Sequence, residues 1–202
     1  MEQTSEIKKR NILRQNNHES NRITCECIEI ALFRLMEQKA YSEISITDII
    51  KVAGVSRSSY YRNYTSKDDI LGKYIRSFNN NLSDALIQYD VIQDNRKIWE
   101  IILKTVSQFA PKYKLIIQAG FCAQLTQELI MRMNASVSGS DYALYYSNVY
   151  WAGAISTVIT EWVKNDMNAP ASTLADICSN LMLNGIHTIA DYKNSCKASA
   201  SL

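Results

Sequence analysis

One stretch, from Ser45 to Leu71, constrains the fold of this 202-residue chain more than any other. Ser45 precedes an apolar-periodic run, and Asp48 lies at the spacing where a carboxylate supports a helix N-terminus that a hydroxyl caps. Gly54, which adopts positive φ freely, and Ser56, a second N-cap residue, limit this helix to about two turns. The pattern predicts two short helices joined by a tight glycine turn, as in a helix-turn-helix. The residues expected to face inward are Ile46, Ile49, Ala53 and Val55.

The second predicted helix carries polar side chains but no carboxylate. From Ser56 to Lys67 the polar groups are hydroxyls, guanidinium groups, an ammonium and an amide, interleaved with Tyr60, Tyr61 and Tyr64. Such groups donate to phosphate oxygens and base edges, whereas a carboxylate would repel the phosphates. The composition is that of a major-groove surface, and an ordinary solvent-facing helix is the alternative.

A set of residues at fixed spacing recurs in a known family. The set comprises Ser45, Ile49, Ala53, Gly54, Val55, Ser56, Tyr60, Tyr61, Tyr64, Lys67 and Ile70 or Leu71. It resembles the DNA-binding signature of the tetracycline-repressor (TetR/AcrR) family of bacterial regulators. Ala40 and Ser58 depart from it, because family members commonly have glycine at both positions. The resemblance implies a dimeric transcriptional regulator whose N-terminal head binds double-stranded DNA.

The resemblance also assigns roles to individual side chains. The residues expected to bind DNA are Ser45, Ser56, Tyr61 and Lys67 for phosphates, Thr47, Arg57 and Ser59 for base edges, and Ser58, Arg62 and Asn63 for flanking contacts. Arg57 is the best candidate for guanine, because its guanidinium can bond O6 and N7 together. Tyr60 and Tyr64 occupy positions that are usually apolar in the family. We interpret them as packing residues whose hydroxyls find a partner at the rim.

The distribution of charge supports an N-terminal DNA-binding surface. The formal net charge is only +2, but residues 1–74 carry twelve Lys and Arg against ten Asp and Glu, and the remainder carries ten of each. Between Ile49 and Lys67 there are four basic residues and no acidic residue. Such a local patch can neutralise several phosphates in a molecule that is nearly neutral overall.

Other functional classes find little support in the sequence. No Gly-rich phosphate loop or Glu-x-x-His pair is present, so we expect no enzymatic activity, cofactor or metal. Cys25 and Cys27 are two residues apart, which places them about 200° apart on a helix, so a shared metal is not expected. The five cysteines lack framework spacing and are expected to be reduced. With no signal peptide and no long apolar run, we expect a cytoplasmic protein, and the resemblance implies a bacterial one that is associated with the nucleoid when bound to DNA.

Helical periodicity extends through most of the chain and predicts an all-α fold. We expect a three-helix helix-turn-helix head, joined by a long helix starting near Lys67 to a helical C-terminal body for dimerisation and effector binding. The predicted divisions are a flexible basic arm (1–20), a DNA-binding domain (21–74), a ligand-binding and dimerisation domain (75–193) and a tail (194–202).

The body is rich in aromatic residues, which by themselves indicate only a core. The resemblance implies that the body encloses an effector pocket, for which the candidates are Trp99, Phe109, Phe121, Gln124 and Tyr145. It also implies that the last two helices meet their copies in a four-helix dimer interface, for which the candidates are Gly153, Ile159, Leu181 and Gly185. The alternative is that these residues pack within one protomer.

The expected function is therefore a repressor released from a palindromic operator by a small-molecule effector. The alternative is an activator or co-regulator of the same family, whose helical body binds a protein partner instead of a small molecule. A body packed solid with side chains would favour the alternative.

Overall fold

A computed structural model describes the backbone of residues 2–138 and 140–199, and the side chains of residues 17–138 and 140–185. Within the described backbone the regular elements are helices and none is a strand, which confirms the all-α prediction. The chain divides into two compact units, Met1–Tyr74 and Ile75–Leu202, which we call the head and the body. Most of the predicted arm's side chains and the last residues of the predicted tail lie outside the described residues.

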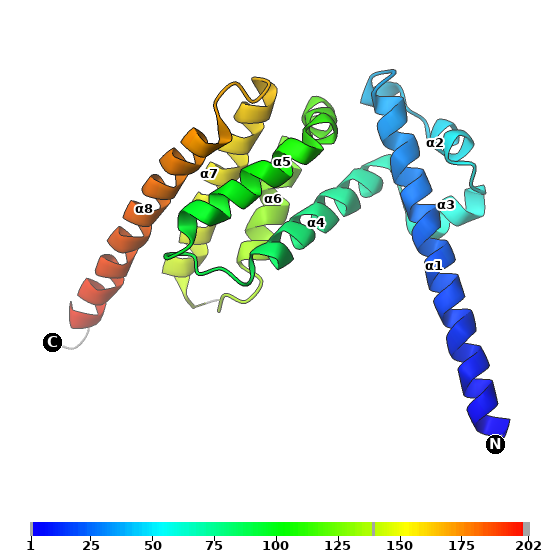
Figure 1. Ribbon diagram of the computed structural model, residues 1–202, viewed down its shortest axis with the longest axis horizontal. Helices are drawn as coiled ribbons and strands as arrows, with labels where there is room; N and C mark the ends of the chain where they lie inside the picture. Colours follow the sequence, from blue (N-terminus) through cyan, green and yellow to red (C-terminus); the bar gives the residue numbers. More distant parts are fainter. Residues whose placement is uncertain (1, 139, 200–202) are drawn as a thin grey trace. The chain divides into compact units, whose positions relative to one another are not determined.

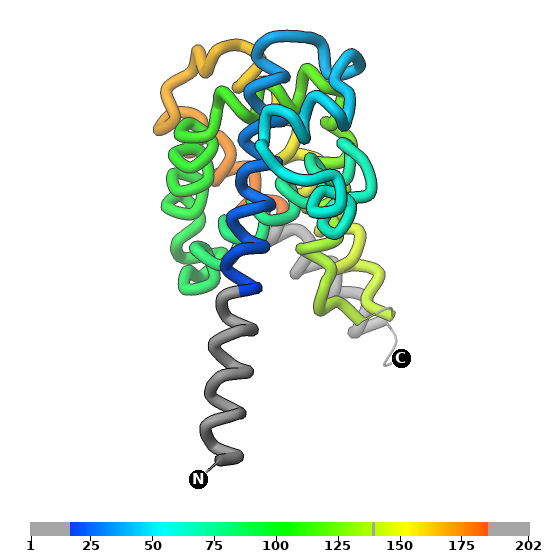
Figure 2. Tube along the Cα trace, turned by 90° about the vertical axis from the view of Figure 1, so that its right-hand side faces the viewer, coloured from blue at the N-terminus to red at the C-terminus, as the bar shows by residue number. Residues whose placement is uncertain are grey.

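The head consists of short helices packed on the end of a long one. Helix α1 spans Glu2–Met36, and after the 3₁₀ turn η1 (Tyr41–Glu43) come α2 (Ile46–Ala53) and α3 (Arg57–Asn63). Both α2 and α3 contact α1, and Figures 1 and 2 show them beside its described part. The fully buried side chains at the centre of the head are Ile28 and Leu32 of α1, Ile49 of α2, Tyr60 of α3, and Ile70 and Leu71 of the next helix, α4 (Lys67–Leu86). This core fixes the orientation of α3.

Helix α1 begins much earlier than the sequence pattern indicated. The predicted flexible arm over residues 1–20 is helical from Glu2 onward, and one uninterrupted helix runs to Met36. The prediction relied on an apolar face, which this segment lacks. However, residues 2–20 contain neither proline nor glycine and are rich in Glu, Gln, Lys and Arg, which favour helix on an exposed surface. Further along, Arg22 pairs with Glu19 and Glu26 at helical spacing.

The body is a bundle in which the longest helices lie side by side. It contains the second part of α4 (Lys67–Leu86), then α5 (Asn95–Gln118), α6 (Cys122–Met133), α7 (Tyr142–Lys164) and α8 (Ala171–Ser199). Helix α5 contacts both α7 and α8, and α6 packs against α7 (Figure 1). The core includes Leu103 and Val106 of α5, Leu125 of α6, Ala152 and Val163 of α7, and Ala175 of α8.

Pro111 lies inside α5, although a proline is more usual in the first turn of a helix. A proline in a helix interior removes one backbone hydrogen bond and usually favours a break or kink. The helix nevertheless continues to Gln118, and Ala110, Tyr113 and Ile116 around the proline are buried. Tertiary packing on both sides of Pro111 therefore outweighs the local cost.

Helices α7 and α8 approach closely where a glycine faces a tryptophan. A Cβ atom built on Gly185 of α8 would lie 2.5 Å from the indole of Trp151 on α7, closer than real Cβ contacts occur. Trp151 is itself buried. Helix α8 continues to Ser199, through most of the segment predicted as a tail.

Candidate functional site

The turn between α2 and α3 has the geometry that its sequence predicts. The Ser45 hydroxyl accepts from the Asp48 backbone amide, and the Asp48 carboxylate accepts from the Ser45 amide, so the capping box is complete. Gly54 ends α2 with φ 67° and ψ 25°, in the left-handed region. Ser56 then caps α3 by accepting from the Ser59 amide. Each N-cap of this kind stabilises its helix by about 1 kcal/mol.

Asp48 is also the acceptor of a salt bridge that joins α1's C-terminal segment to α2. The Lys39 ammonium lies 2.9 Å from the Asp48 carboxylate. The hydrogen bond from Lys39, followed by those from the Ser45 amide and hydroxyl, holds the pKa of Asp48 well below its ordinary value. The one acidic residue on α2 is therefore committed to structure, and its charge is offset by Lys39.

The inward face of α3 is formed by Tyr60 and Tyr64. The Tyr64 hydroxyl donates to the Glu29 carboxylate of α1 at 3.0 Å, as expected of a packing tyrosine with a partner at the rim. Tyr60 differs, because its hydroxyl is fully buried and has no hydrogen-bond partner among the described residues. Burial raises the pKa of Tyr60 to about 12, so the phenol is neutral in ordinary solution. For Tyr60 the expectation of a partner was wrong.

The opposite face of α3 is exposed and contains the residues predicted to read DNA. Arg57, Ser58, Tyr61 and Arg62 are all exposed, and the Arg57 guanidinium carbon lies 5.6 Å from the centre of the Tyr61 ring. Stacking of this kind restrains the arginine while its N–H groups still point to solvent. Among the described residues neither arginine has an acidic partner. Thr47, near the start of α2, is also exposed.

Five of the predicted DNA-binding side chains make local hydrogen bonds, namely Ser45, Ser56, Ser58, Ser59 and Asn63. The hydroxyls of Ser45 and Ser56 accept the cap bonds described above, and Asn63 donates to the Ser59 carbonyl at 3.0 Å. The Ser59 hydroxyl lies 2.8 Å from that of Ser56. The Ser45 hydroxyl also donates its hydrogen to the Asp48 carboxylate at 2.8 Å, so it keeps acceptor capacity only. Both serine caps remain exposed, whereas Ser59 and Asn63 are half-buried.

Lys67 does not have the geometry of a phosphate-binding residue. Its ammonium donates to three backbone carbonyls, those of Tyr41 at 2.6 Å, Ile44 at 2.9 Å and Ser42 at 3.3 Å. It also lies 4.5 Å from the centre of the Tyr41 ring. A lysine ammonium has three N–H donors, and all three are matched inside the head. The side chain therefore fastens the start of α4 to the turn before α2, in place of the predicted contact with DNA.

Lys51 is a further cation that the residue-by-residue comparison with the family signature did not select. It lies in the last turn of α2, is exposed, and has no acidic partner within the described residues. The count of four basic residues between Ile49 and Lys67 already included it, and this was the signal that could have identified it. With Lys67 committed to carbonyls, the exposed cations of the α2–α3 segment are Lys51, Arg57 and Arg62.

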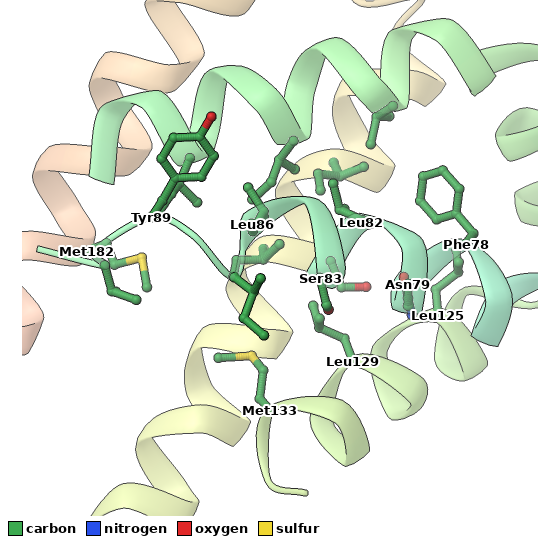
Figure 3. Close-up of a pocket in the computed structure, with 18 of the residues that line it drawn as sticks. Phe78, Asn79, Leu82, Ser83, Leu86, Tyr89, Leu125, Leu129, Met133 and Met182 are labelled. Carbon is green, nitrogen blue, oxygen red and sulfur yellow. The ribbon is translucent and has the colours of Figure 1, made fainter. Parts of the chain in front are cut away.

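The body contains a cavity of about 430 Å³. Its wall comes from all five helices of the body, and Figure 3 shows Phe78, Leu82 and Leu86 of α4 opposite Leu125, Leu129 and Met133 of α6. The polar residues in the wall are Asn79, Ser83, Tyr89, Asn95, Tyr113 and Ser156. A volume of this size falls within the range of small-molecule sites.

None of the five residues predicted to line an effector pocket lines this cavity. Trp99 is buried on another face of α5, and Phe109 and Tyr145 are exposed. Phe121 and Gln124 are half-buried near the start of α6, whose cavity face begins at Leu125. The prediction chose aromatic residues by type, whereas the wall is mainly aliphatic and follows particular faces of the helices.

The four residues predicted at a dimer interface are used in different ways. Ile159 is only 5% exposed and lines the cavity, and Gly185 packs against Trp151, so both serve the protomer's own packing. Leu181 is 63% exposed. Gly153 has open space where a Cβ would project. Only Leu181 and Gly153 thus remain available to a partner.

The cysteines and carboxylates of the described residues do not converge on a metal site. Among those described, no group of three His, Cys, Asp or Glu residues could hold a metal ion. Cys25, Cys27, Cys122 and Cys178 have free thiols. No described helix is both long enough and apolar enough to cross a membrane.

Comparison with known families agrees with the geometry of the head. Residues 31–74 match the model for bacterial regulatory proteins of the tetR family, and residues 80–184 match the model for a transcriptional regulator C-terminal region. This chain belongs to the TetR family. It is therefore a DNA-binding transcriptional regulator and not an enzyme.

Solved structures with the same fold include regulators of low sequence identity to this TetR-family protein. The fatty acid degradation regulator FadR from Bacillus halodurans is 16% identical, with a TM-score of 0.53 over 80% of this chain and 95% of that one. The dihydroxyacetone kinase operon activator DhaS is 20% identical, with a TM-score of 0.50 over 82% of this chain and 97% of that one. The search of curated proteins gives no match. At these identities the likeness concerns the fold alone.

Proposed function

We propose that this TetR-family protein is a dimeric repressor that binds a palindromic operator and is released from it by a small-molecule effector. The observation that carries the proposal is the exposed face of α3, where Arg57 and Arg62 lie without an acidic partner among the described residues. On a recognition helix, guanidinium groups with free N–H donors can bond guanine O6 and N7 or phosphate oxygens.

A dimer is supported by an apolar face that the protomer leaves exposed. Tyr142, Tyr146 and Tyr150 recur every four residues on α7, and all are exposed. On α8, Ile177 and Leu181 have the same spacing and are also exposed. Residues four apart share one side of a helix, so each helix presents a stripe of large side chains. A second copy of the chain, related by two-fold symmetry, is the proposed occupant of this surface.

Two-fold symmetry gives the operator a specific form. The two copies of α3 would enter successive major grooves on one side of the duplex, and each half-site would be the inverted repeat of the other. Their centres would then lie about one helical turn, roughly 34 Å, or a multiple of it, apart.

The effector would act through α4. Residues Phe78, Leu82 and Leu86 of this helix line the cavity, and Lys67 at its start is bonded to the turn that precedes α2. A ligand that favours one orientation of α4 would change the spacing of the two heads in the dimer. It can shift the affinity for DNA only by the difference in its own affinity for the two orientations.

An activator or co-regulator with a protein partner is the second candidate, and activation is the role named for DhaS. The cavity in the body supports the small-molecule proposal over this alternative. A reporter gene placed behind the selected operator distinguishes them, because a repressor lowers transcription until its effector is added. We place the protein in the bacterial cytoplasm, on the nucleoid when bound to DNA.

The test of DNA reading begins with selection of bound duplexes from a random pool. Arg57→Ala should then weaken binding to the selected site by about 1–3 kcal/mol and relax the preference at one base pair of each half-site. Lys104→Ala, which removes an exposed cation from α5 of the body, is the matched control and should leave the affinity unchanged. Equal loss at all sequences for Arg57→Ala would contradict its assignment as a base reader.

The test of assembly is the molar mass of the protein in solution, measured by light scattering after size exclusion. The wild-type chain should be a dimer at micromolar concentration, and Leu181→Glu should shift it to monomer by placing a charge on the exposed stripe. Ile30→Glu alters an exposed apolar residue on α1 of the head and should stay dimeric. A wild-type monomer would refute the proposed interface.

A further inference from the structure

The wall of the body cavity contains no charged side chain among the described residues. Its twenty lining residues are apolar or neutral polar. The Lys97 ammonium lies 4.7 Å from the ring centre of the wall residue Tyr89. An adjoining hollow that shares Asn79 is lined by Arg76 and Glu128, which form a two-point ion pair at 2.9 and 3.1 Å. Glu128 is 6% exposed and already bonded to Arg76, so neither group is placed to pair with a charge in the cavity.

Asn95 presents an acceptor that the protein leaves unsatisfied. This residue, at the start of α5, lines the cavity and is only 2% exposed. Its Nδ2 donates to the Val91 carbonyl at 2.8 Å, and this bond determines which way round the amide lies. The Oδ1 atom has no hydrogen-bond partner in the described part of the chain and is covered by its neighbours, so a ligand in the cavity reaches it only when the Asn95 side chain turns or those neighbours shift. A buried carbonyl oxygen in this state favours a ligand that donates a hydrogen bond.

The other polar groups of the wall do not supply that donor. Thr126 donates to the Cys122 carbonyl at 3.2 Å, so the Ser156 hydroxyl, 2.7 Å from the Thr126 hydroxyl, uses its own hydrogen in that contact. Ser156 can then only accept. Asn79 Nδ2 is a buried donor with no partner among the described residues, but it lies on α4 and makes no bond to Asn95.

From this inventory we propose that the effector is an uncharged, lipophilic molecule with an O–H or N–H group that donates to Asn95 Oδ1. The inference deepens the proposed effector function and rests on it. Taking the roughly 30 Å³ share of one water molecule in the liquid, the cavity holds about 14 groups of that size. A medium-chain alcohol has suitable bulk and chemistry. Asn79 Nδ2 offers a second contact to a ligand that also carries an acceptor.

The same inventory excludes charged relatives of such a ligand. A carboxylate or an ammonium would leave water for an apolar wall without a counter-charge, which costs far more than a neutral hydroxyl does. A ligand that lacks a donor would fill the cavity but leave Asn95 Oδ1 unpaired. Since an unpaired buried polar group costs 1–3 kcal/mol, its affinity should fall by roughly tenfold or more.

The experiment compares four probes of matched chain length by isothermal titration calorimetry with the full-length protein, without DNA. They are 1-decanol, 1-methoxydecane, decanoate and decylammonium, at pH 7. We expect 1-decanol to bind about tenfold more tightly than its methyl ether, which keeps the acceptor oxygen but not the donor. We expect the two ions to bind more weakly still. Equal affinity for alcohol and ether, tighter binding of either ion, or no binding of 1-decanol would each overturn the inference.

Two variants connect the preference to Asn95. Asn95→Leu, of similar volume, should reduce the alcohol-to-ether ratio to near one. Ser107→Ala removes a hydroxyl from α5 outside the cavity wall and should keep the wild-type ratio. Thermal unfolding establishes whether each variant is folded. If Asn95→Leu does not fold, the comparison of the four probes with the wild-type protein still decides the proposal. An unchanged ratio in folded Asn95→Leu would count against the role of Asn95.

Failure of this inference is distinguishable from failure of the proposed repressor function. Affinity for operator DNA is measured by fluorescence anisotropy, with and without a saturating amount of 1-decanol. Binding of 1-decanol with the expected selectivity supports the ligand class, even where the affinity for DNA does not change. An unchanged affinity for DNA with 1-decanol bound would instead refute the release of DNA by a ligand of this cavity.

Discussion

Replacing Lys67 by methionine separates a structural role of this lysine from a role in DNA binding. Methionine keeps an unbranched side chain but removes the charge and the three donors. Two of the carbonyl bonds, at 2.6 and 2.9 Å, have normal length, and the third, at 3.3 Å, is weak. Each bond from a charged donor contributes about 1.5–3 kcal/mol, and carbonyls near the surface regain water when the donor is lost. We therefore expect a loss of about 2–3 kcal/mol in the stability of the head.

The loss should be local, and hydrogen exchange measured by mass spectrometry can locate it. Amides of residues 41–53 should exchange faster in Lys67→Met, whereas those of α5 and α7 should not change. Circular dichroism should show earlier thermal unfolding of the head. The salt dependence of operator binding provides the second measurement, because each phosphate contact contributes about 0.9 to the slope of log K against log salt.

Arg62→Met is the matched control, since Arg62 is exposed on α3 and has no acidic partner among the described residues. It should lower the salt slope by about one and leave exchange in residues 41–53 unchanged. Lys67→Met should instead speed exchange in residues 41–53 and leave the salt slope unchanged. A salt slope lowered by about one in Lys67→Met, with unchanged exchange, would refute the structural role argued from the three carbonyls.

Three further predictions concern the stability of the head. Gly54→Ala should destabilise it by about 1 kcal/mol, because φ at this position is 67° and a Cβ is disfavoured in the left-handed region, and the midpoint of urea unfolding measures the change. An unchanged midpoint would contradict the argument that a Cβ at residue 54 strains the backbone. Tyr60→Phe removes a buried hydroxyl without a partner among the described residues, so stability should stay the same or rise by up to about 1 kcal/mol. A clear loss in calorimetry would show that the hydroxyl does have a partner. The pKa of Asp48 is held low by Lys39 and Ser45, so its contribution is complete above the unfolded-state pKa of about 3.9 and disappears as pH falls below it. Asp48→Asn should be less stable than wild type at pH 7, and the difference should shrink towards pH 2; a constant difference across an acid titration would argue against this linkage.

The helix-turn-helix was predictable because its determinants are local. The capping pair Ser45 and Asp48, the left-handed Gly54 and the cap at Ser56 act over three or four residues, and all have the expected geometry. The presence of helices in the body could likewise be predicted from apolar periodicity. The extent of α1 could not be predicted, because a helix without an apolar face leaves no periodic signal.

The chemistry of individual side chains was less predictable, because it depends on neighbours distant in the sequence. Lys67 matches the family's pattern, yet its ammonium is bonded to carbonyls more than 20 residues earlier. Ile102 and Leu129 both line the cavity, but apolar periodicity within single helices cannot show that two residues face one cavity. Asn95 was not selected at all, since a single polar residue in a helix gives no sign that its oxygen is buried.

The contact between Gly185 and Trp151 limits how this protein can evolve. One partner has the largest of all side chains and the other has only hydrogen, and an added Cβ would lie 2.5 Å from the indole. A change at residue 185 is therefore tolerated only in descendants whose residue 151 has already become smaller. The order of the two substitutions is fixed by volume, and lineages that retain the tryptophan should retain the glycine.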